Sequence, residues 1–165
     1  MALIPQKSID SVQLRIKHEE FNWKTYNAMS NWLNLQGYEG ASKLFKKYAD
    51  DELVHKNWAV DYLLDMNIQP IEPSEDQPKI EFNGLPQIIA LSYELELKTT
   101  NEIEEFITQC IKENDHMTRI LLEQKFLPEQ KEEMASRQMW LDKLNSFGTS
   151  EVALRMLDED MGDKA

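Results

Sequence analysis

"IQPIEPSEDQPKIEFNG", residues 68–84, is the stretch of the 165-residue chain that decides its fold. Pro70, Pro73 and Pro78 exclude a helix here, because proline lacks the amide hydrogen that a helix interior requires. The segment is therefore expected to be an extended connection. At ~3.3 Å per residue it can span ~56 Å, which exceeds the ~43 Å length of a helix of nearly thirty residues. The connection can run from one end of a helical bundle to the other.

Long amphipathic helices are expected on both sides of this connection, because apolar residues recur there at steps of three and four. Ser8 or Asp10 can cap the first helix, and Gly37 and Gly148 suit the left-handed position that follows a helix end. Pro128 is expected to kink the fourth helix. The predicted helices cover about residues 8–36, 39–67, 85–113, 116–145 and 149–161.

The chain is predicted to form one all-α domain over residues 1–165. Short links make two antiparallel hairpins of helices, whereas the long connection makes the third helix parallel to the second. The predicted fold class is a four-helix bundle with one long crossover loop and a short C-terminal fifth helix. The 5 glycines, 6 prolines and 29% charged residues agree with this class, because such a composition is typical of long solvated helices.

The overall charge and the single cysteine exclude several classes of function. A net charge of -12 repels nucleic acid and anionic membrane surfaces and favours cations. Cys110 has no second cysteine with which to form an intramolecular disulfide or a Cys-x-x-Cys metal site, which suits a reducing cytoplasm. We find neither an export signal nor an apolar run of ~18 residues that could span a membrane. The expectation is a soluble cytoplasmic protein.

The apolar stripe of each long helix is interrupted near its middle by polar side chains. These are Glu19 in the first helix, Glu52 and His55 in the second, Glu96 in the third, and Gln130 and Glu133 in the fourth, with Glu129 and Glu132 beside that stripe. At ~1.5 Å per residue, the residues within the stripes fall in one layer, ~17 to 26 Å from the end where the first helix begins. The side chains are therefore expected to meet in the bundle core.

Four carboxylates cannot all stay ionised in a core of low dielectric constant unless positive charge accompanies them. No lysine lies in this layer of the stripes, so a pair of divalent cations is the simplest compensation. Glu52 and His55 project from one helix face and can hold one ion, while Glu52 bridges to a second. The alternative is a metal-free helical bundle that serves as a scaffold or interaction protein, whose mid-helix carboxylates would face water.

At these positions the chain resembles the ferritin family, specifically its haem-free bacterial or heavy-chain type. The resemblance spans about residues 8–161 and rests on four segments: residues 19–26, "YEGASKLFKKYADDELVH" at 38–55, "YELE" at 93–96 and "EQKEE" at 129–133. A haem-binding bacterioferritin would carry Glu-x-x-His in the fourth helix as well, and a methionine after Glu52, where this chain has Leu53.

The resemblance implies a di-iron domain and assigns roles to individual residues. It implies that the first iron is held by Glu19, Glu52 and His55. It implies that the second iron is held by Glu52, Glu96 and Glu133, with Gln130 nearby and Tyr26 beside the site. It further implies a third, inner iron site at Asp51, Glu129 and Glu132, although family members usually have glutamate in place of Asp51.

The resemblance also implies an activity and an assembly. The implied protein is a ferroxidase that stores and detoxifies iron: it binds two Fe(II), oxidises them with dioxygen or hydrogen peroxide, and mineralises Fe(III) inside a shell of twenty-four copies. The imidazole should make the first position hold iron more firmly than the second, which has only oxygen ligands. Glu123 is a candidate for a threefold channel. The apolar face of the fifth helix has the form of the element that packs at fourfold axes, and comprises Ala153, Leu154, Leu157 and Met161.

Overall fold

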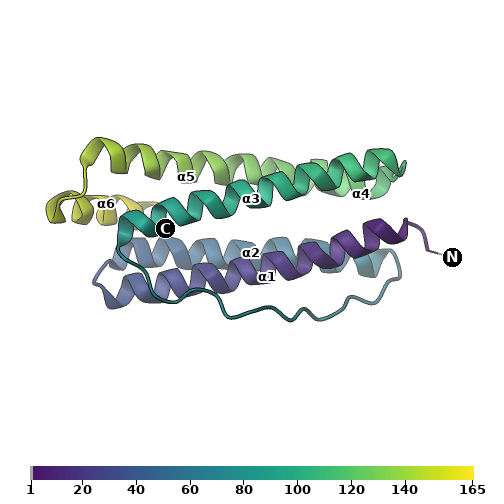
Figure 1. Ribbon diagram of the computed structural model, residues 1–165, viewed down its shortest axis with the longest axis horizontal. Coiled ribbons are helices and arrows are strands. Elements are labelled where there is room, and N and C mark those ends of the chain that lie inside the picture. Colours follow the sequence, from purple (N-terminus) through teal and green to yellow (C-terminus); the bar gives the residue numbers. More distant parts are fainter. Residues whose placement is uncertain (1) are drawn as a thin grey trace.

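The computed structural model describes residues 2–165, which form a bundle of helices without strands in that range (Figure 1). The elements are α1 (Gln6–Leu35), α2 (Glu39–Asp65), α3 (Leu85–Lys112), α4 (His116–Leu121), the π-helical turn η1 (Leu122–Phe126), α5 (Leu127–Phe147) and α6 (Glu151–Lys164). Helices α4, η1 and α5 together make the fourth rod of the bundle. The predicted all-α bundle with a short C-terminal helix is confirmed.

The connection between α2 and α3 runs the length of the bundle, as its prolines and its length predict (Figure 1). Helices α1 and α2 are antiparallel, and the long connection returns the chain to the opposite end, so that α3 runs parallel to α2 (Figure 1). The fourth rod then runs antiparallel to α3. The predicted topology is therefore the observed one.

The first helix begins earlier than predicted. The carbonyl oxygen of Pro5 accepts hydrogen bonds from the backbone N–H groups of Ser8 (3.0 Å) and Ile9 (3.2 Å), so the helix starts at Gln6. The capping role predicted for Ser8 or Asp10 is wrong, because Ser8 is buried within the first turn. The other helix ends agree with prediction to within three residues, and both Gly37 and Gly148 have φ of 83°.

The fourth rod is interrupted where a single helix over 116–145 was expected. Pro128 lacks an amide hydrogen, and its ring would meet the carbonyl group of Gln124 in a regular helix. The chain accommodates this conflict with η1, a π-helical turn that ends two residues before the proline. Such turns occur mostly as single insertions within α-helices, often at functional sites. The irregularity predicted for Pro128 thus takes the form of a wider turn upstream of it.

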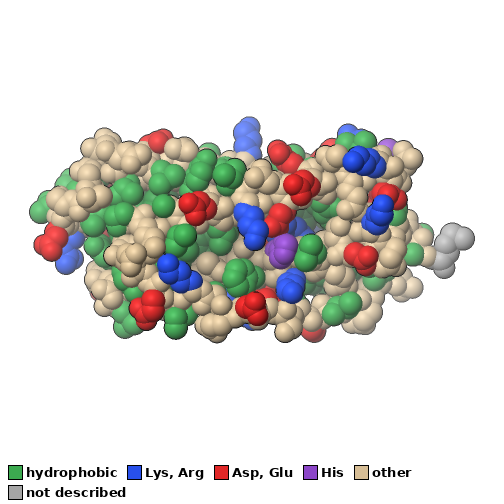
Figure 2. All heavy atoms as spheres, viewed as in Figure 1, with side chains coloured by type: hydrophobic (Ala, Val, Ile, Leu, Met, Phe, Trp, Pro, Cys, Tyr) green, Lys and Arg blue, Asp and Glu red, His purple; other side chains and the backbone are tan. Residues whose placement is uncertain are grey.

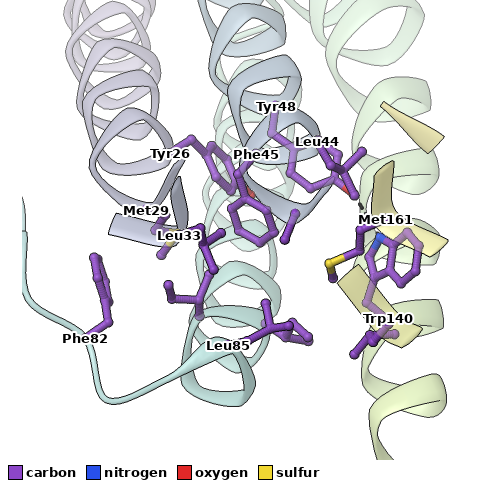
Figure 3. Close-up of a cluster of buried hydrophobic side chains, with 14 of the residues drawn as sticks. Tyr26, Met29, Leu33, Leu44, Phe45, Tyr48, Phe82, Leu85, Trp140 and Met161 are labelled. Carbon is purple, nitrogen blue, oxygen red and sulfur yellow. Dashed lines mark hydrogen bonds between the residues drawn. The ribbon is translucent and has the colours of Figure 1, made fainter. Parts of the chain in front are cut away.

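Two apolar clusters fill the two ends of the bundle and leave a polar layer between them. One cluster, drawn in Figure 3, includes Tyr26, Phe45 and Trp140 and lies beside α6. The other includes Ile16 and Leu63 and lies near the N-terminal end of α1. Fully burying such side chains contributes ~1.5–3 kcal/mol each, so the two clusters can stabilise a fold that contains a polar middle.

Helix α6 packs its apolar face on the bundle of its own chain. Leu157 and Met161 are fully buried in the cluster of Figure 3, and Ala153 is also buried. Gly40 of α2 meets α6 so closely that a Cβ atom there would lie 2.0 Å from the carbonyl oxygen of Asp158. This apolar face, which was expected to pack at a fourfold axis, covers the core of its own chain. The partly buried Leu154 also packs against that core.

Charges of both signs are interspersed with hydrophobic side chains on the face shown in Figure 2. Across residues 2–165, we find no helix that combines the length and the apolar character needed to cross a membrane.

Candidate metal centre

The six side chains predicted to share one layer are all buried in the middle of the bundle. Their exposed fractions range from 0% to 6%, for Glu19, Glu52, His55, Glu96, Gln130 and Glu133. They come from α1, α2, α3 and α5, so every rod of the bundle contributes at least one. The metal-free scaffold predicts that these carboxylates face water, and that expectation is wrong.

The ligand atoms form three groups, each of which could hold a metal ion. Within each group the oxygen and nitrogen atoms lie no more than 4.8 Å apart, and the groups are Glu19–Glu52–His55, Glu52–Glu96–Glu133 and His55–Glu129–Glu133. Glu52 belongs to the first two groups, so it can bridge two adjacent ions. The first two groups are the sets that the family resemblance implies for the first and second iron.

The residues implied for a third iron are divided between two places. Glu129 is in the group with His55 and Glu133. Asp51 and Glu132 instead line a neighbouring pocket of about 280 Å³, together with Glu133 and Arg137. Burial raises the pKa of Asp51 above its ordinary value. The structure thus does not bring the three residues into one ligand group, and the pocket of Asp51 and Glu132 also contains a basic side chain.

Several oxygen atoms in the centre are buried without a hydrogen-bond donor among the described residues. They are Oε2 of Glu19, both carboxylate oxygens of Glu52 and Oε2 of Glu133. A buried polar atom without a partner costs ~1–3 kcal/mol. A divalent cation bound between these oxygens and His55 would satisfy them, so the donor set fits a hard metal ion such as iron.

His55 lies between the carboxylates with both ring nitrogens facing acid. Its Nδ1 atom is 3.6 Å from Oε2 of Glu52 and 3.8 Å from Oε2 of Glu19, while Nε2 is 3.7 Å from Oε1 of Glu133. Burial would lower the pKa of His55, but the surrounding carboxylates raise it to about 9. The carboxylates therefore favour the protonated, positively charged form of the imidazole.

Two buried arginines supply further positive charge, and the sequence analysis missed both. Arg15 donates from Nε to Oε1 of Glu19 (2.8 Å) and from Nη1 to Oε2 of Glu102 (3.0 Å). Arg137 contacts Glu96 at 3.4 Å. Neither arginine lies on an apolar stripe, but each is one helical turn from a ligand, four residues before Glu19 or four after Glu133. This spacing is the sequence signal that could identify both.

The charges divide the carboxylates into two kinds. Burial by itself would raise the pKa of Glu19, but the Arg15 guanidinium lowers it to about 2, so Glu19 stays ionised. For Glu52 and Glu133, burial and the neighbouring carboxylates raise the pKa well above the usual range. Protonation of these two carboxyl groups is therefore more favourable than in water, so a cation that binds there competes with protons.

Tyr26 and Gln130 hold Glu96 from two sides. The Tyr26 hydroxyl donates a hydrogen bond to Oε1 of Glu96. The Gln130 amide donates to Oε2 of Glu96 (3.1 Å) and also to Oγ1 of Thr100 (3.1 Å). Both residues thus contact a member of the second group of ligands, as their predicted place beside the site requires.

Known proteins with similar sequences and structures are ferritins. Residues 12–147 match the family described as the ferritin-like domain. A probable bacterial non-heme ferritin-like protein from Haemophilus influenzae is 30% identical over 145 residues, or 88% of this chain and 87% of that protein. A bacterial non-heme ferritin from Escherichia coli is 25% identical over 159 residues, or 96% of each chain. An open pore ferritin from the hyperthermophilic archaeon Archaeoglobus fulgidus superposes with a TM-score of 0.93, at 25% identity and 98% coverage of each chain.

The family match and the buried ligand groups together define the class: the chain belongs to the ferritin family. Its bacterial relatives are non-heme proteins, so the resemblance to the haem-free bacterial type is confirmed.

Proposed function

We propose that this protein stores and detoxifies iron, and that its bundle is a ferroxidase centre that oxidises Fe(II). The observation that carries the proposal is the set of buried carboxylate oxygens without donors, arranged around His55 in a ferritin fold. Glu19, Glu52 and His55 would take one Fe(II), and Glu52, Glu96 and Glu133 a second. Buried carboxylate oxygens are normally paired, so four without a donor around one histidine favour a cation between them.

Binding and oxidation follow from the charges of the centre. Fe(II) competes with protons for Glu52, Glu133 and His55, and the ionised carboxylates neutralise the incoming charge. Each Fe(II) then gives one electron to dioxygen, which takes up two protons and leaves as hydrogen peroxide. Peroxide can serve as oxidant in turn. Carboxylates favour the ferric product as hard oxygen ligands, and Fe(III) passes on to a mineral.

Storage requires an enclosed space, so we propose a homo-oligomeric cage of twenty-four copies in the cytoplasm. Asp51 and Glu132, in the pocket beside Glu133, and Glu129, in the group with His55, would hold an inner iron in transit. Glu123, which accepts a hydrogen bond from Arg119 (2.8 Å) and is 38% exposed, would line a channel between copies. Size-exclusion chromatography at the mass of one chain would remove the cage from this proposal.

The ferroxidase is tested by adding Fe(II) in air and following ferric absorbance for wild type, Glu52→Ala and His55→Ala. We expect fast oxidation by wild type and only the slow background rate with either variant. Glu104→Ala is the matched control, because this exposed glutamate lies on α3 away from the ligand groups. Equal, slow oxidation by wild type and the two site variants would overturn the proposal.

A further inference from the structure

The buried side chains of the fourth rod are spaced differently before and after Gln130. Upstream they recur every four residues, at Thr118, Leu122, Phe126 and Gln130. Downstream they alternate steps of three and four, at Glu133, Arg137, Trp140 and Leu144. In a regular helix each four-residue step moves a side chain ~40° around the axis, whereas alternating steps of three and four nearly cancel. A regular helix would therefore turn Gln130 ~120° away from the face that Thr118 occupies.

The π-helical turn η1 removes most of this rotation. The backbone N–H of Leu127 donates to the carbonyl oxygen of Leu122, five residues back instead of the usual four. Because the wider turn takes up one extra residue, the chain rotates by only ~20° between Thr118 and Gln130. The same reasoning places Leu144 within ~20° of Thr118. One extra residue in η1 therefore gives the whole rod a single buried face.

This buried face carries the residues that the fourth rod gives to the metal centre. Gln130 and Glu133 are 2% and 6% exposed, and Gln130 donates to Oε2 of Glu96 at 3.1 Å. Without the extra residue, α5 would be turned by ~100° relative to α4. Glu129 and Glu132 would then lie on the continuation of the buried face, and Gln130 would leave it.

Pro128 fixes the place of the extra residue. It lies in the first turn of α5, where the missing amide hydrogen costs no helical hydrogen bond. If the wide turn moved downstream, Pro128 would fall in the interior of a regular helix, which proline disfavours strongly. The wide turn is thereby held upstream of Gln130 and Glu133.

We propose that Pro128 is a positioning residue: by holding the extra residue in η1 it sets the rotation of α5, and so directs Gln130 and Glu133 into the second ligand group, Glu52–Glu96–Glu133. The proposal rests on the proposed function, because it concerns one of the two metal positions. The first ligand group contains no residue of the fourth rod, so it does not depend on this rotation. A change at Pro128 should therefore affect one position and spare the other.

The test is anaerobic titration of the assembled protein with Co(II), followed by calorimetry, together with thermal unfolding of the metal-free variants. Pro128→Ala frees the wide turn to lie on either side of Gln130 and Glu133. Because only part of the population then has the binding rotation, we expect one of the two Co(II) affinities to weaken at least about threefold. The other should stay within about twofold of wild type. Two unchanged affinities would overturn the role of Pro128.

Deletion of Lys125 combined with Pro128→Ala tests the rotation directly. Lys125 is an exposed residue of η1, so the double change removes both the extra residue and the proline. The remaining chain can form a regular helix with the same buried face. Both Co(II) affinities should return to within about twofold of wild type, because the binding rotation is again the only one populated. Loss of either affinity, or failure to fold, would overturn the argument.

The matched controls lie on α3, which is regular. Pro86→Ala removes a proline from the first turn of α3 and should leave both affinities as in wild type. Deletion of the exposed Asn101 should strongly lower the midpoint of thermal unfolding, because the buried residues after it, such as Ile103 and Phe106, would turn by ~100°. A stable Asn101 deletion would overturn the argument, since a one-residue rotation would then be harmless.

Failure of the proposed function has a different signature. If wild type binds no Co(II), the proposed function is overturned, and thermal unfolding alone decides the rotation. The variant with Lys125 deleted and Pro128→Ala should then unfold within a few degrees of wild type. A midpoint as low as that of the Asn101 deletion would overturn the rotation as well.

Discussion

Replacing Arg15 with methionine should destabilise the metal-free protein, because Arg15 compensates a glutamate that is buried and ionised. The pKa of Glu19 falls from 4.5 to about 2 in the folded chain. At ~1.4 kcal/mol per pKa unit, this shift corresponds to about 3 kcal/mol of stability at neutral pH. Because the folded-state pKa is depressed, the contribution is complete above about pH 4.5 and is lost as the pH falls through 2. We expect Arg15→Met to lose between about 1 and 3 kcal/mol, since His55 and Glu52 contribute part of the shift.

The assay is urea unfolding at pH 7 with a chelator present and with equal concentrations of each variant. Arg119→Met is the control, because the Arg119–Glu123 pair has the same four-residue spacing and the same 2.8 Å Nε–Oε1 distance as Arg15–Glu19. The two pairs differ in exposure, at 38% for both side chains of the control and at most 5% for the buried pair. An exposed pair contributes ~0–1 kcal/mol, so the control should change little.

Adding Co(II) should then stabilise Arg15→Met more than it stabilises wild type. The variant has one internal positive charge fewer, so the first cation binds more tightly and shifts unfolding further by mass action. A loss of stability in Arg15→Met no larger than in Arg119→Met would refute the reasoning, because it would mean that Glu19 is not held ionised by its neighbour.

Three further predictions concern the packing of α6 and the ligands themselves. Gly40→Ala should cost ~1–3 kcal/mol in thermal unfolding, because the new Cβ atom would lie 2.0 Å from the carbonyl oxygen of Asp158 and force α6 away from α2; an unchanged midpoint would contradict this contact. The affinity of the first position for Co(II) should rise steadily between pH 6 and about pH 9, because His55, with its pKa raised to about 9, must lose a proton to bind. Calorimetry that gave the same affinity at pH 6 and pH 8 would contradict this dependence. Tyr26→Phe should cost ~1.5–3 kcal/mol in urea unfolding, because it removes a buried hydrogen bond to the Glu96 carboxylate; an effect below ~0.5 kcal/mol would show that Arg137 and Gln130 suffice.

The polar layer could be predicted from the sequence because helix geometry converts residue number into height. Glu19 and Glu96 are far apart in the chain, but their heights of ~17 and ~26 Å from the bundle end place them in one layer once the topology is known. The topology itself followed from three prolines in the crossover. The π-helical turn before Pro128 could not be predicted in form, because periodicity shows where a regular helix fails but not how the backbone accommodates the failure.

The surface on which α6 packs could not be predicted from the sequence either. An apolar face on a short helix indicates only that another surface must cover it. Whether that is another copy or the same chain depends on backbone approach, and here the contact between Gly40 and Gly162 brings α6 onto α2. The exposed Val152 and Met156, at 71% and 56%, are the side chains that α6 leaves for contacts outside the chain.

The two arginines were missed because an arginine near an amphipathic stripe is normally assigned to the surface, whereas its long side chain can reach inward from the edge of the stripe. Their presence changes the physical account of the centre. Arg15 pairs with Glu19 and Arg137 pairs with Glu96, so two of the four glutamates have a fixed positive partner within the chain. Burial and the neighbouring carboxylates raise the pKa of Glu52 and Glu133, which limits the remaining buried negative charge. The chain's own residues therefore supply part of the compensation that the sequence assigned to metal alone.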